Sequence, residues 1–379
     1  MRIAFHTPLN PVSDGGVSGD RRMARQLIVA LEGLGHDVAP VAAPKTYFRE
    51  ADPVRFASTA AEAAHLRDDL LAGYRSGQPQ PDLWFTYHNY YRSPDFLGPG
   101  ISTALGIPYV TAESSDSTRR ATGEWARHTA IVRHGLATGD LHFFFTDRDR
   151  QGLEPWRNDG TALLALPPFV TLAPEQPRPA ASSGTPRLIT VAMMREGAKL
   201  KSYLALARIL ARSRDEDWTL SIIGDGPCRA EIEAAFARLP KGRVTWHGQL
   251  DRNGTQAALA RHDIFLWPGI GEAYGLVYLE AQAAGLPVVA FDSGGVAETV
   301  RTGETALLVP EHDEEALTSA LIRLLRDGAL RESMGAAARH FILAERTPAR
   351  AAQRLAEGLT LALRNRNAKL KTTSGKATP

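Results

Sequence analysis

Short apolar runs alternate with longer amphipathic stretches along almost the whole chain. The short runs are rich in Val, Ile and Phe, whereas the longer stretches repeat their apolar residues with the period of a helix. This rhythm is typical of β-α units that build parallel sheets. A first series of strands is predicted at residues 2–7, 37–42, 82–88, 108–113 and 141–146. A second series is predicted at residues 187–193, 219–224, 243–248, 263–268, 287–291 and 306–310.

The segment between the two series is dense in Pro, Ser, Gly and Ala, a composition that favours a linker. A length of 379 residues also favours two domains over one hydrophobic core. We therefore expect an α/β fold with two parallel-sheet domains. The predicted parts are an N-terminal domain (1–172), a linker (173–187), a second domain (188–345), a C-terminal helix packing back towards the first domain (346–366) and a flexible tail (367–379).

Composition narrows the class of protein without naming a function. Hydrophobic residues make up 44% and charged residues 23% of the chain, and no apolar run is long enough to span a membrane. A single cysteine, Cys228, excludes an internal disulfide and fits a cytoplasmic protein. Residues 346–379 hold eight basic side chains against one acid, Glu357. This end of the chain is either a solvated terminus or a peripheral contact with the inner face of a membrane, and no nucleic-acid-binding face is evident.

The chemistry is expected at the carboxyl ends of the strands, where loops and helix starts bind ligands. The strand at 263–268 leads into a helix predicted to begin near residues 273–275. Glu272 precedes this helix, and Glu280 lies one turn inside it. The amides at the predicted helix start belong to Ala273, Tyr274, Gly275 and Leu276. Such amides favour an anion, whereas two carboxylates need hydroxyl donors, so the combination indicates a nucleotide-sugar site. The alternative is a capping acid at Glu272 and a salt-bridge partner at Glu280.

Other loops add weaker signals. The first strand runs into a Gly-rich loop that opens a helix near Asp20 and could approach an anion, but its sequence does not match the dinucleotide fingerprint of dehydrogenases. In the second domain, Arg195, Lys199 and Lys201 follow the first strand and could neutralise a diphosphate, or else be solvated cations on a helix. His247 is either close to a nucleotide base or a histidine at the edge of the core.

Four segments carry a resemblance to a known family. They are "GEAYGLVYLEAQAAGLPVVAFDSGGVAETVRTGETALLVP" (271–310), "IIGDGP" (222–227), "HGQL" (247–250) and "SGDRRMARQLIVALEGLGHDV" (18–38). In combination they resemble the retaining glycosyltransferases of family four. The similarity runs through most of residues 187–340 and is much weaker in the first domain. It implies the GT-B architecture, in which two Rossmann-like domains face a central cleft.

The resemblance also implies roles for individual residues. Glu272 would contact hydroxyls of the transferred sugar, and Glu280 would bind the ribose. The backbone around Ala273, Tyr274, Gly275 and Leu276 would face the diphosphate and sugar. Arg195 and Lys199 would form the diphosphate pair. The base-binding edge would comprise Gly248, Gln249 and Leu250, and Gly19 would meet the phosphates.

The first domain departs from the family pattern. Ser18-Gly19 stands where the family has two glycines, and the spacing from Arg195 to Lys199 is shorter than usual. Many members place a histidine after the fourth strand, near the transferred sugar. Here Glu113 stands at that place. Either Glu113 makes this contact with sugar or acceptor, or His88 after the preceding strand serves instead.

The implied reaction moves a hexose-type sugar from a nucleoside-diphosphate sugar to an acceptor with retention of anomeric configuration. No metal or other cofactor is expected, and a UDP-sugar is favoured over a GDP-sugar. The acceptor is a carbohydrate, a small molecule or a lipid-linked compound, and the oligomeric state is left open. An arginine group in the first domain is either a contact for an anionic acceptor or a solvated face; its members are Arg119, Arg120, Arg127 and Arg133. A sugar-nucleotide epimerase and a non-catalytic nucleotide-sugar-binding protein remain as alternatives.

Overall fold

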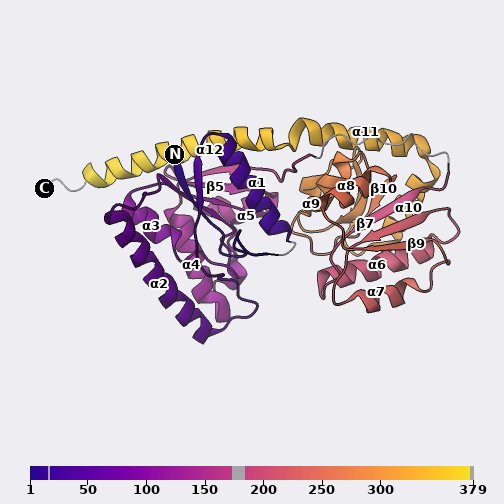
Figure 1. The fold of residues 1–379 in the computed structure, drawn as a ribbon, viewed down its shortest axis with the longest axis horizontal. Coiled ribbons are helices and arrows are strands. Elements are labelled where there is room, and N and C mark those ends of the chain that lie inside the picture. The colour runs from indigo at the N-terminus through magenta and orange to yellow at the C-terminus, as the bar shows by residue number, and fades with distance from the viewer. Residues whose placement is uncertain (16–17, 173–183, 376–379) are drawn as a thin grey trace. The chain divides into compact units, whose positions relative to one another are not determined.

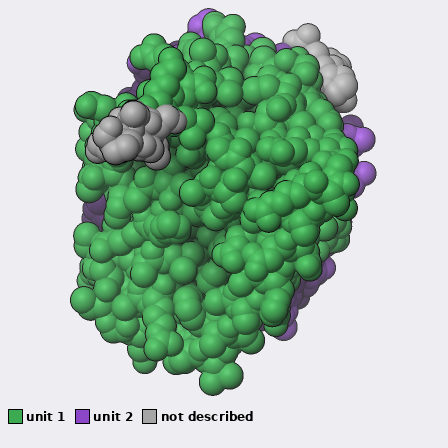
Figure 2. Space-filling model, turned by 90° about the vertical axis from the view of Figure 1, so that its left-hand side faces the viewer, with its two compact units in different colours: residues 1–167, 348–379 green, residues 168–347 purple. Residues whose placement is uncertain are grey.

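The computed structural model describes residues 1–15, 18–172 and 184–375. The chain divides into two compact units, which Figure 2 colours separately. Unit 1 comprises Met1–Pro167 with Pro348–Pro379, and unit 2 comprises Pro168–Thr347. Residues 168–172 therefore belong to unit 2, although the sequence analysis placed them in the first domain. Most of the predicted linker, residues 173–183, lies outside the described residues.

Unit 1 is built on a six-stranded sheet in which all neighbouring strands are parallel. The strand order is β2-β1-β3-β4-β5-β6. The strands are β1 (Arg2–His6), β2 (Asp37–Pro40), β3 (Leu83–Tyr87), β4 (Tyr109–Ala112), β5 (Leu141–Phe144) and β6 (Ala162–Ala165). The central strands β3 and β4 are buried on both faces, which explains why their sequences are mostly apolar rather than alternating.

Helices cover this sheet. In Figure 1, α2, α3 and α4 are grouped below the strands, and α12 runs along the upper side of the same unit. The helices are α1 (Gly19–Gly33), α2 (Pro53–Arg75), α3 (Gly98–Leu105), α4 (Ala126–Thr138), α5 (Asp147–Leu153) and α12 (Pro348–Gly375), with short 3-10 turns at Thr118–Arg120, Gly123–Trp125 and Glu154–Trp156. Local sequence sets the helix starts: Asp52 accepts hydrogen bonds from two amides of the first turn of α2, and Pro53 follows it directly.

The C-terminal helix is longer than the sequence indicated. Because α12 continues to Gly375, the prediction of a flexible tail is wrong for residues 367–375, whereas 376–379 lie outside the described residues. The physical reason is the buried carboxylate of Asp140, which has no exposed surface. Arg366 Nη2 lies 2.8 Å from Asp140 Oδ2, and Lys369 Nζ lies 3.0 Å from Oδ1. These ion pairs hold the polar end of the helix against the sheet, where the absence of an apolar pattern suggested fraying.

Unit 2 contains a second six-stranded parallel sheet with the order β12-β11-β10-β7-β8-β9. Its strands are β7 (Arg187–Val191), β8 (Thr219–Ile223), β9 (Val244–Gly248), β10 (Ile264–Leu266), β11 (Val288–Asp292) and β12 (Ala306–Pro310). Its helices are α6 (Ala198–Arg212), α7 (Arg229–Phe236), α8 (Arg252–Ala260), α9 (Leu276–Ala283), α10 (Glu314–Arg326) and α11 (Gly328–Glu345), with a 3-10 turn at Val296–Thr299.

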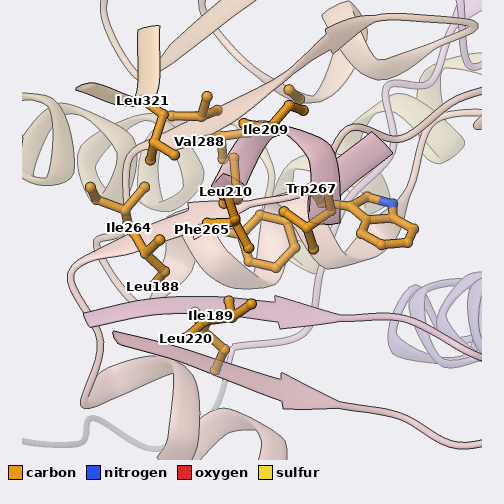
Figure 3. Packing of buried hydrophobic residues seen from close by; sticks show 14 of the residues in the cluster. Leu188, Ile189, Ile209, Leu210, Leu220, Ile264, Phe265, Trp267, Val288 and Leu321 are labelled. Carbon is orange, nitrogen blue, oxygen red and sulfur yellow. The ribbon is translucent and has the colours of Figure 1, made fainter. Parts of the chain in front are cut away.

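The core of unit 2 is formed by side chains from its helices and from its sheet. Figure 3 shows Ile209 and Leu210 of α6 and Leu321 of α10 packed against strand residues such as Phe265 and Val288. All five of these side chains are fully buried. Burial of this apolar surface stabilises the sheet and fixes the loops at the carboxyl ends of its strands.

The expected fold class is confirmed: both units are α/β, each with a parallel sheet, and the eleven predicted strands all form within one or two residues of the expected ends. The sequence analysis missed β6, whose four residues, Ala162–Ala165, are only half-buried at the sheet edge. A run of Ala and Leu has no clear strand preference, and pairing with β5 decides its conformation.

Candidate functional site

Three side chains of unit 2 meet at the carboxyl end of β10. Glu272 lies in the loop between β10 and α9, and its side chain is 13% exposed. Lys199, from the first turn of α6, donates a hydrogen bond to Glu272 Oε1. The indole Nε1 of Trp267 donates to the same oxygen at 3.0 Å. The carboxylate therefore has a fixed position and keeps a second oxygen, Oε2, that can accept bonds from a ligand.

The backbone of this loop is held from both sides. The amide of Ile270 donates to Ser202 Oγ at 2.9 Å, and the amide of Gly271 donates to Ser293 Oγ at 2.8 Å. Gly294 lies against the carbonyl group of Glu272, where an added Cβ would come within 2.9 Å of the carbonyl carbon. Only glycine fits there, and its positive φ of 60° would also strain any other residue.

Tyr278 forms the floor beneath the loop. Its hydroxyl donates to the carbonyl of Trp267 at 3.3 Å, and its ring is fully buried. A Cβ on Gly275 would lie 2.7 Å from the Tyr278 ring, so the loop can close over the ring only with glycine at this position. Burial, with a contribution from Glu272, raises the pKa of the Tyr278 phenol well above its usual value. The phenol is therefore a neutral hydrogen-bond donor that orders the loop.

The helix after this loop begins slightly later than expected. Gly275 takes the left-handed conformation, with a φ of 78°, and α9 begins at Leu276 rather than at residues 273–275. Tyr274 and Leu276 are buried, whereas Ala273 is exposed. Glu280 lies on α9 and is 91% buried. A carboxylate at this depth requires hydrogen-bonding partners.

The other residues predicted to bind the donor also lie in loops of unit 2. Arg195 is exposed between β7 and α6, and its carbonyl accepts the amide of Leu200 at 3.0 Å. Gly248 ends β9 with a φ of 66°, followed by exposed Gln249 and by Leu250, which packs on the core. The structure thus brings Lys199 and Glu272 into direct contact. Among the described residues Arg195 has no such contact with Glu272, and the ligand roles of these residues remain predictions.

In the sequence analysis "GDGP" appears only within a segment that carries the family resemblance, and the structure shows that this turn also has a packing role. Gly224 and Gly226 pack against the carbonyl groups of Ala192 and Met194, and a Cβ on Gly226 would lie 2.9 Å from the carbonyl carbon of Met194. The amide of Cys228 donates to the Met194 carbonyl at 3.0 Å. This turn therefore positions the loop that carries Arg195. The sequence signal for this close packing was the pair of glycines on either side of one residue. In the structure both glycines have φ near 150°.

A separate polar cluster lies at the carboxyl edge of the unit 1 sheet. His88 directly follows β3 and Glu113 directly follows β4. The amide of His88 donates to Ala112 O at 3.0 Å, and the amide of Glu113 donates to Phe143 O at 3.1 Å. Both residues have a positive φ, 68° for His88 and 53° for Glu113. Left-handed backbone is uncommon outside glycine and concentrates at functional sites.

Further carboxylates face the imidazole of His88. Its Nε2 lies 3.6 Å from Asp20 Oδ1 and 3.8 Å from Glu113 Oε2. The hydroxyl of Tyr87 donates to Glu113 Oε2 at 2.8 Å. Asp149, on α5 after β5, lies close enough to act electrostatically on both His88 and Glu113. Two carboxylates therefore lie beside one imidazole, and the charge of a third, Asp149, acts on it.

This arrangement shifts the protonation of its members. Burial would lower the pKa of His88, but Glu113 and Asp20 outweigh it, so that the pKa is raised. Burial, with repulsion from Asp149 and Asp20, raises the pKa of Glu113 to about 7. Burial also raises the pKa of Asp149. For Asp20, burial would raise the pKa, but the nearby imidazole of His88 outweighs it, and the pKa is lowered. The cluster can therefore gain and release protons near neutral pH.

The structure brings His88 and Glu113 together, so the two residues proposed as alternatives form one site. The sequence analysis did not assign Asp20 or Asp149 to it. The carboxyl ends of the adjacent strands β1, β3, β4 and β5 meet at this edge. Acidic residues in the segments that follow β1 and β5 were therefore the sequence signal by which Asp20 and Asp149 could have been identified. Gly19 begins α1 beside Asp20, and its predicted phosphate contact remains a prediction.

No helix in the described part of the chain combines the length and apolar character required to cross a membrane. Within residues 1–15, 18–172 and 184–375, no group of three or more His, Cys, Asp or Glu side chains has a geometry suited to a metal ion. Metal independence remains a prediction.

Comparison with known proteins locates the family signal in unit 2. Residues 185–327 match the family described as "Glycosyl transferases group 1". A phosphatidyl-myo-inositol mannosyltransferase of Mycobacterium leprae is 46% identical over 123 residues, which cover 32% of each chain. A sulfoquinovosyl transferase of Arabidopsis thaliana is 37% identical over 123 residues, covering 32% of this chain and 24% of that protein. The match thus spans a third or less of these curated relatives.

Similarity to solved structures extends over both units. The structure of a sucrose-phosphate synthase from Thermosynechococcus elongatus superposes with a TM-score of 0.70 at 21% identity, covering 94% of this chain and 97% of that one. At this identity the likeness shows the fold alone, which is GT-B. The group 1 match in unit 2 and the two parallel sheets of this architecture support a glycosyltransferase of family four.

Proposed function

We propose that the protein transfers a hexose-type sugar from a nucleoside-diphosphate sugar to a hydroxyl group of an acceptor, with retention of anomeric configuration. Unit 2 binds the donor and unit 1 binds the acceptor. The group 1 match in unit 2 supports the transferase class. The donor sugar, the stereochemistry and the acceptor belong to the proposal.

The observation that carries the proposal is the fixed carboxylate of Glu272. Lys199 and Trp267 bind one of its oxygens, and Gly294 packs against the backbone of Glu272. A carboxylate accepts hydrogen bonds from hydroxyl groups, which a sugar ring supplies in adjacent pairs. Glu272 therefore orients the transferred sugar, while Lys199 adds positive charge beside it for the diphosphate.

In this mechanism, electrostatic stabilisation of the leaving group provides much of the rate enhancement. Arg195, Lys199 and the start of α9 stabilise the charge that develops on the diphosphate as the bond to the sugar breaks. The acceptor hydroxyl then attacks from the face that the diphosphate leaves, through an ion pair, and its proton passes to the leaving phosphate oxygen. Glu272 positions the sugar and forms no covalent bond with it. Glu280 binds the ribose that remains with the nucleotide.

The sequence favoured UDP as the donor nucleotide, but a relative from Mycolicibacterium smegmatis bears the name GDP-mannose-dependent mannosyltransferase. Its match covers 35% of this chain at 38% identity, so the base is a question for experiment. We also propose a cytoplasmic location, with peripheral contact to the inner face of the membrane if the acceptor carries a lipid.

A panel of UDP- and GDP-sugars, each incubated with the purified protein with and without candidate acceptors, tests the proposal. A glycosylated acceptor with the anomeric configuration of the donor, together with one nucleotide diphosphate per product, is the expected result. Formation of an epimeric nucleotide sugar without acceptor would instead identify an epimerase. Nucleotide-sugar binding without turnover across the acceptor panel would identify a non-catalytic binding protein.

A further inference from the structure

We propose that the carboxyl edge of the unit 1 sheet binds an unphosphorylated polyol, such as a sugar or a cyclitol, and that His88 and Glu113 hold one of its ring hydroxyls. This inference rests on the proposed function and names the chemical class of its acceptor. The site consists of His88, Glu113, Asp20, Asp149 and Tyr90.

The imidazole of His88 provides the first argument. Its side chain is 8% exposed, and among the described residues Nε2 has no hydrogen-bond partner. This atom points towards Asp20 and Glu113, but at 3.6 and 3.8 Å both carboxylates are beyond hydrogen-bonding distance. A buried polar atom without a partner is unfavourable and indicates a missing ligand or water. A ligand hydroxyl fits, because it can accept a bond from Nε2 and donate one to Glu113.

The backbone provides the second argument. His88 and Glu113 are two of the three non-glycine residues with a positive φ in the described part of the chain. They sit side by side at the ends of paired strands, which directs both side chains to one place. Two neighbouring residues in a disfavoured conformation are retained when their side-chain geometry is needed.

Charge determines which ligand fits. Asp20 and Glu113 lie within 4 Å of the His88 imidazole, and Asp149 acts electrostatically on both His88 and Glu113, so negative charge collects at this site. A phosphate group would be repelled by this charge. The start of α1 does not offset it, because Asp20 occupies the first turn and accepts a hydrogen bond from Asn10.

Three arginines of unit 1 contact protein groups. Arg133 binds both carboxylate oxygens of Asp116, with Nη2 3.0 Å from Oδ2. Arg25 donates to the carbonyl of Val12 at 3.2 Å. The guanidinium of Arg120 lies 5.2 Å from the centre of the Tyr91 ring. The arginine group predicted to bind an anionic acceptor thus includes two members that already contact protein groups.

An aromatic surface adjoins the polar cluster. The ring centres of His88 and Tyr90 are 6.3 Å apart, and those of Tyr90 and Tyr91 are 5.8 Å apart. Both tyrosines are half-buried. Burial, with Tyr47 and Asp20 close by, raises the pKa of the Tyr90 phenol. Aromatic faces beside carboxylates suit the apolar faces and polar edges of a polyol ring.

Equilibrium binding to the full-length protein, measured by ligand-detected NMR without nucleotide, tests this inference. The probes are myo-inositol, glucose and glucose 6-phosphate. We expect binding of at least one neutral polyol and at least tenfold weaker binding of glucose 6-phosphate than of glucose. Glu113→Gln and His88→Asn should each weaken polyol binding at least tenfold. Asparagine tolerates the positive φ of His88, so the second variant keeps the backbone.

A charge variant with a matched control isolates the repulsion. Asp149→Asn should strengthen glucose 6-phosphate binding several-fold and leave glucose binding within twofold. Asp147→Asn removes the same charge from the exposed side of α5 and should change neither. Equal or tighter binding of the phosphate ester, no binding of either neutral polyol, or wild-type binding in both His88→Asn and Glu113→Gln would overturn the inference. Nucleotide binding by unit 2 is measured separately, so its loss would count against the proposed function alone.

Discussion

The imidazole Nε2 of His88 and the carboxylate Oε2 of Glu113 lie 3.8 Å apart, at the ends of two paired strands of unit 1. Each residue has a positive φ, and each is almost completely enclosed. Their proximity gives the first domain a proton-binding centre that no single motif in the sequence indicates. Its position at the carboxyl edge of a parallel sheet is where this architecture binds ligands.

This centre predicts a pH dependence of stability. The pKa of Glu113 is raised from 4.5 to about 7, so between these pH values the folded chain keeps a proton that the unfolded chain releases. Stability therefore falls as pH rises through this window. The raised pKa of His88 acts in the same direction: its contribution is full below pH 6.5 and is lost as pH rises through its folded value. In Glu113→Gln, the difference in unfolding free energy between pH 5 and 7.5 should shrink by about 2 kcal/mol.

Thermal and urea unfolding at pH 5 and 7.5 measure this difference. Glu62→Gln, at an exposed position of α2, is the matched control and should keep the wild-type dependence. Parallel pH profiles for wild type and Glu113→Gln would contradict the assignment.

Gly294 is predicted to be essential for the shape of the donor loop. Gly294→Ala introduces a Cβ against the backbone of Glu272 at a positive φ, so the loop must move. We expect destabilisation by about 3 kcal/mol and a loss of nucleotide-sugar affinity. Gly303→Ala has the same type of strain, with a φ of 83°, but its Cβ meets no atom within 4 Å. This control should lose only about 1 kcal/mol and bind donor normally. Equal effects of the two substitutions would show that strain, rather than the contact with Glu272, matters.

The Asp140 ion pairs predict that α12 is required for the stability of unit 1. Arg366→Met removes a buried partner of a fully buried carboxylate and should lower the unfolding free energy by about 3 kcal/mol, even though Lys369 remains. Arg364→Met changes the same residue type on an exposed position of the same helix and should have an effect within about 0.5 kcal/mol. Denaturant titration compares them. Similar small effects would mean that the end of α12 contributes little.

Lys199 is predicted to contribute through its charge at the donor site. Lys199→Gln removes a cation from Glu272 and from the diphosphate, and should lower kcat by about 100-fold. Lys201→Gln, at an exposed position in the same turn of α6, is the control and should retain wild-type kcat and KM. Steady-state kinetics with a saturating acceptor separates them. A wild-type kcat in Lys199→Gln would exclude this role.

The sequence predicted the repeated β-α units well, but it did not predict the edge strand β6 or the helical end of α12. The strands at Leu188, Ile264 and Val288 form the centre of an apolar core, so their burial could be inferred from composition. The half-buried strand β6 depends on its pairing with β5. The end of α12 depends on the contact between Arg366 and Asp140, which are 226 positions apart in the sequence. Such long-range contacts leave no periodic signal in a single sequence.

The same limit applies to the sites. Glu272 could be identified because it lies beside a helix start within one short motif. Its contact with Lys199 joins residues 73 positions apart and needs the fold. His88 and Glu113 could each be singled out, but their convergence with Asp149 depends on strand order. The left-handed backbone at both residues also has no signature in the sequence, because neither is glycine.

The central claim is that Glu272 positions the transferred sugar while Glu280 binds the nucleotide. Nucleotide-diphosphate affinity and sugar-transfer turnover, measured side by side for Glu272→Gln and Glu280→Gln, test it most directly. Glu332→Gln, at an exposed position of α11, serves as the control. The account predicts at least a 100-fold loss of turnover with near-wild-type nucleotide affinity for Glu272→Gln, and at least tenfold weaker nucleotide binding for Glu280→Gln. Wild-type turnover in Glu272→Gln, or identical behaviour of the two variants, would contradict it.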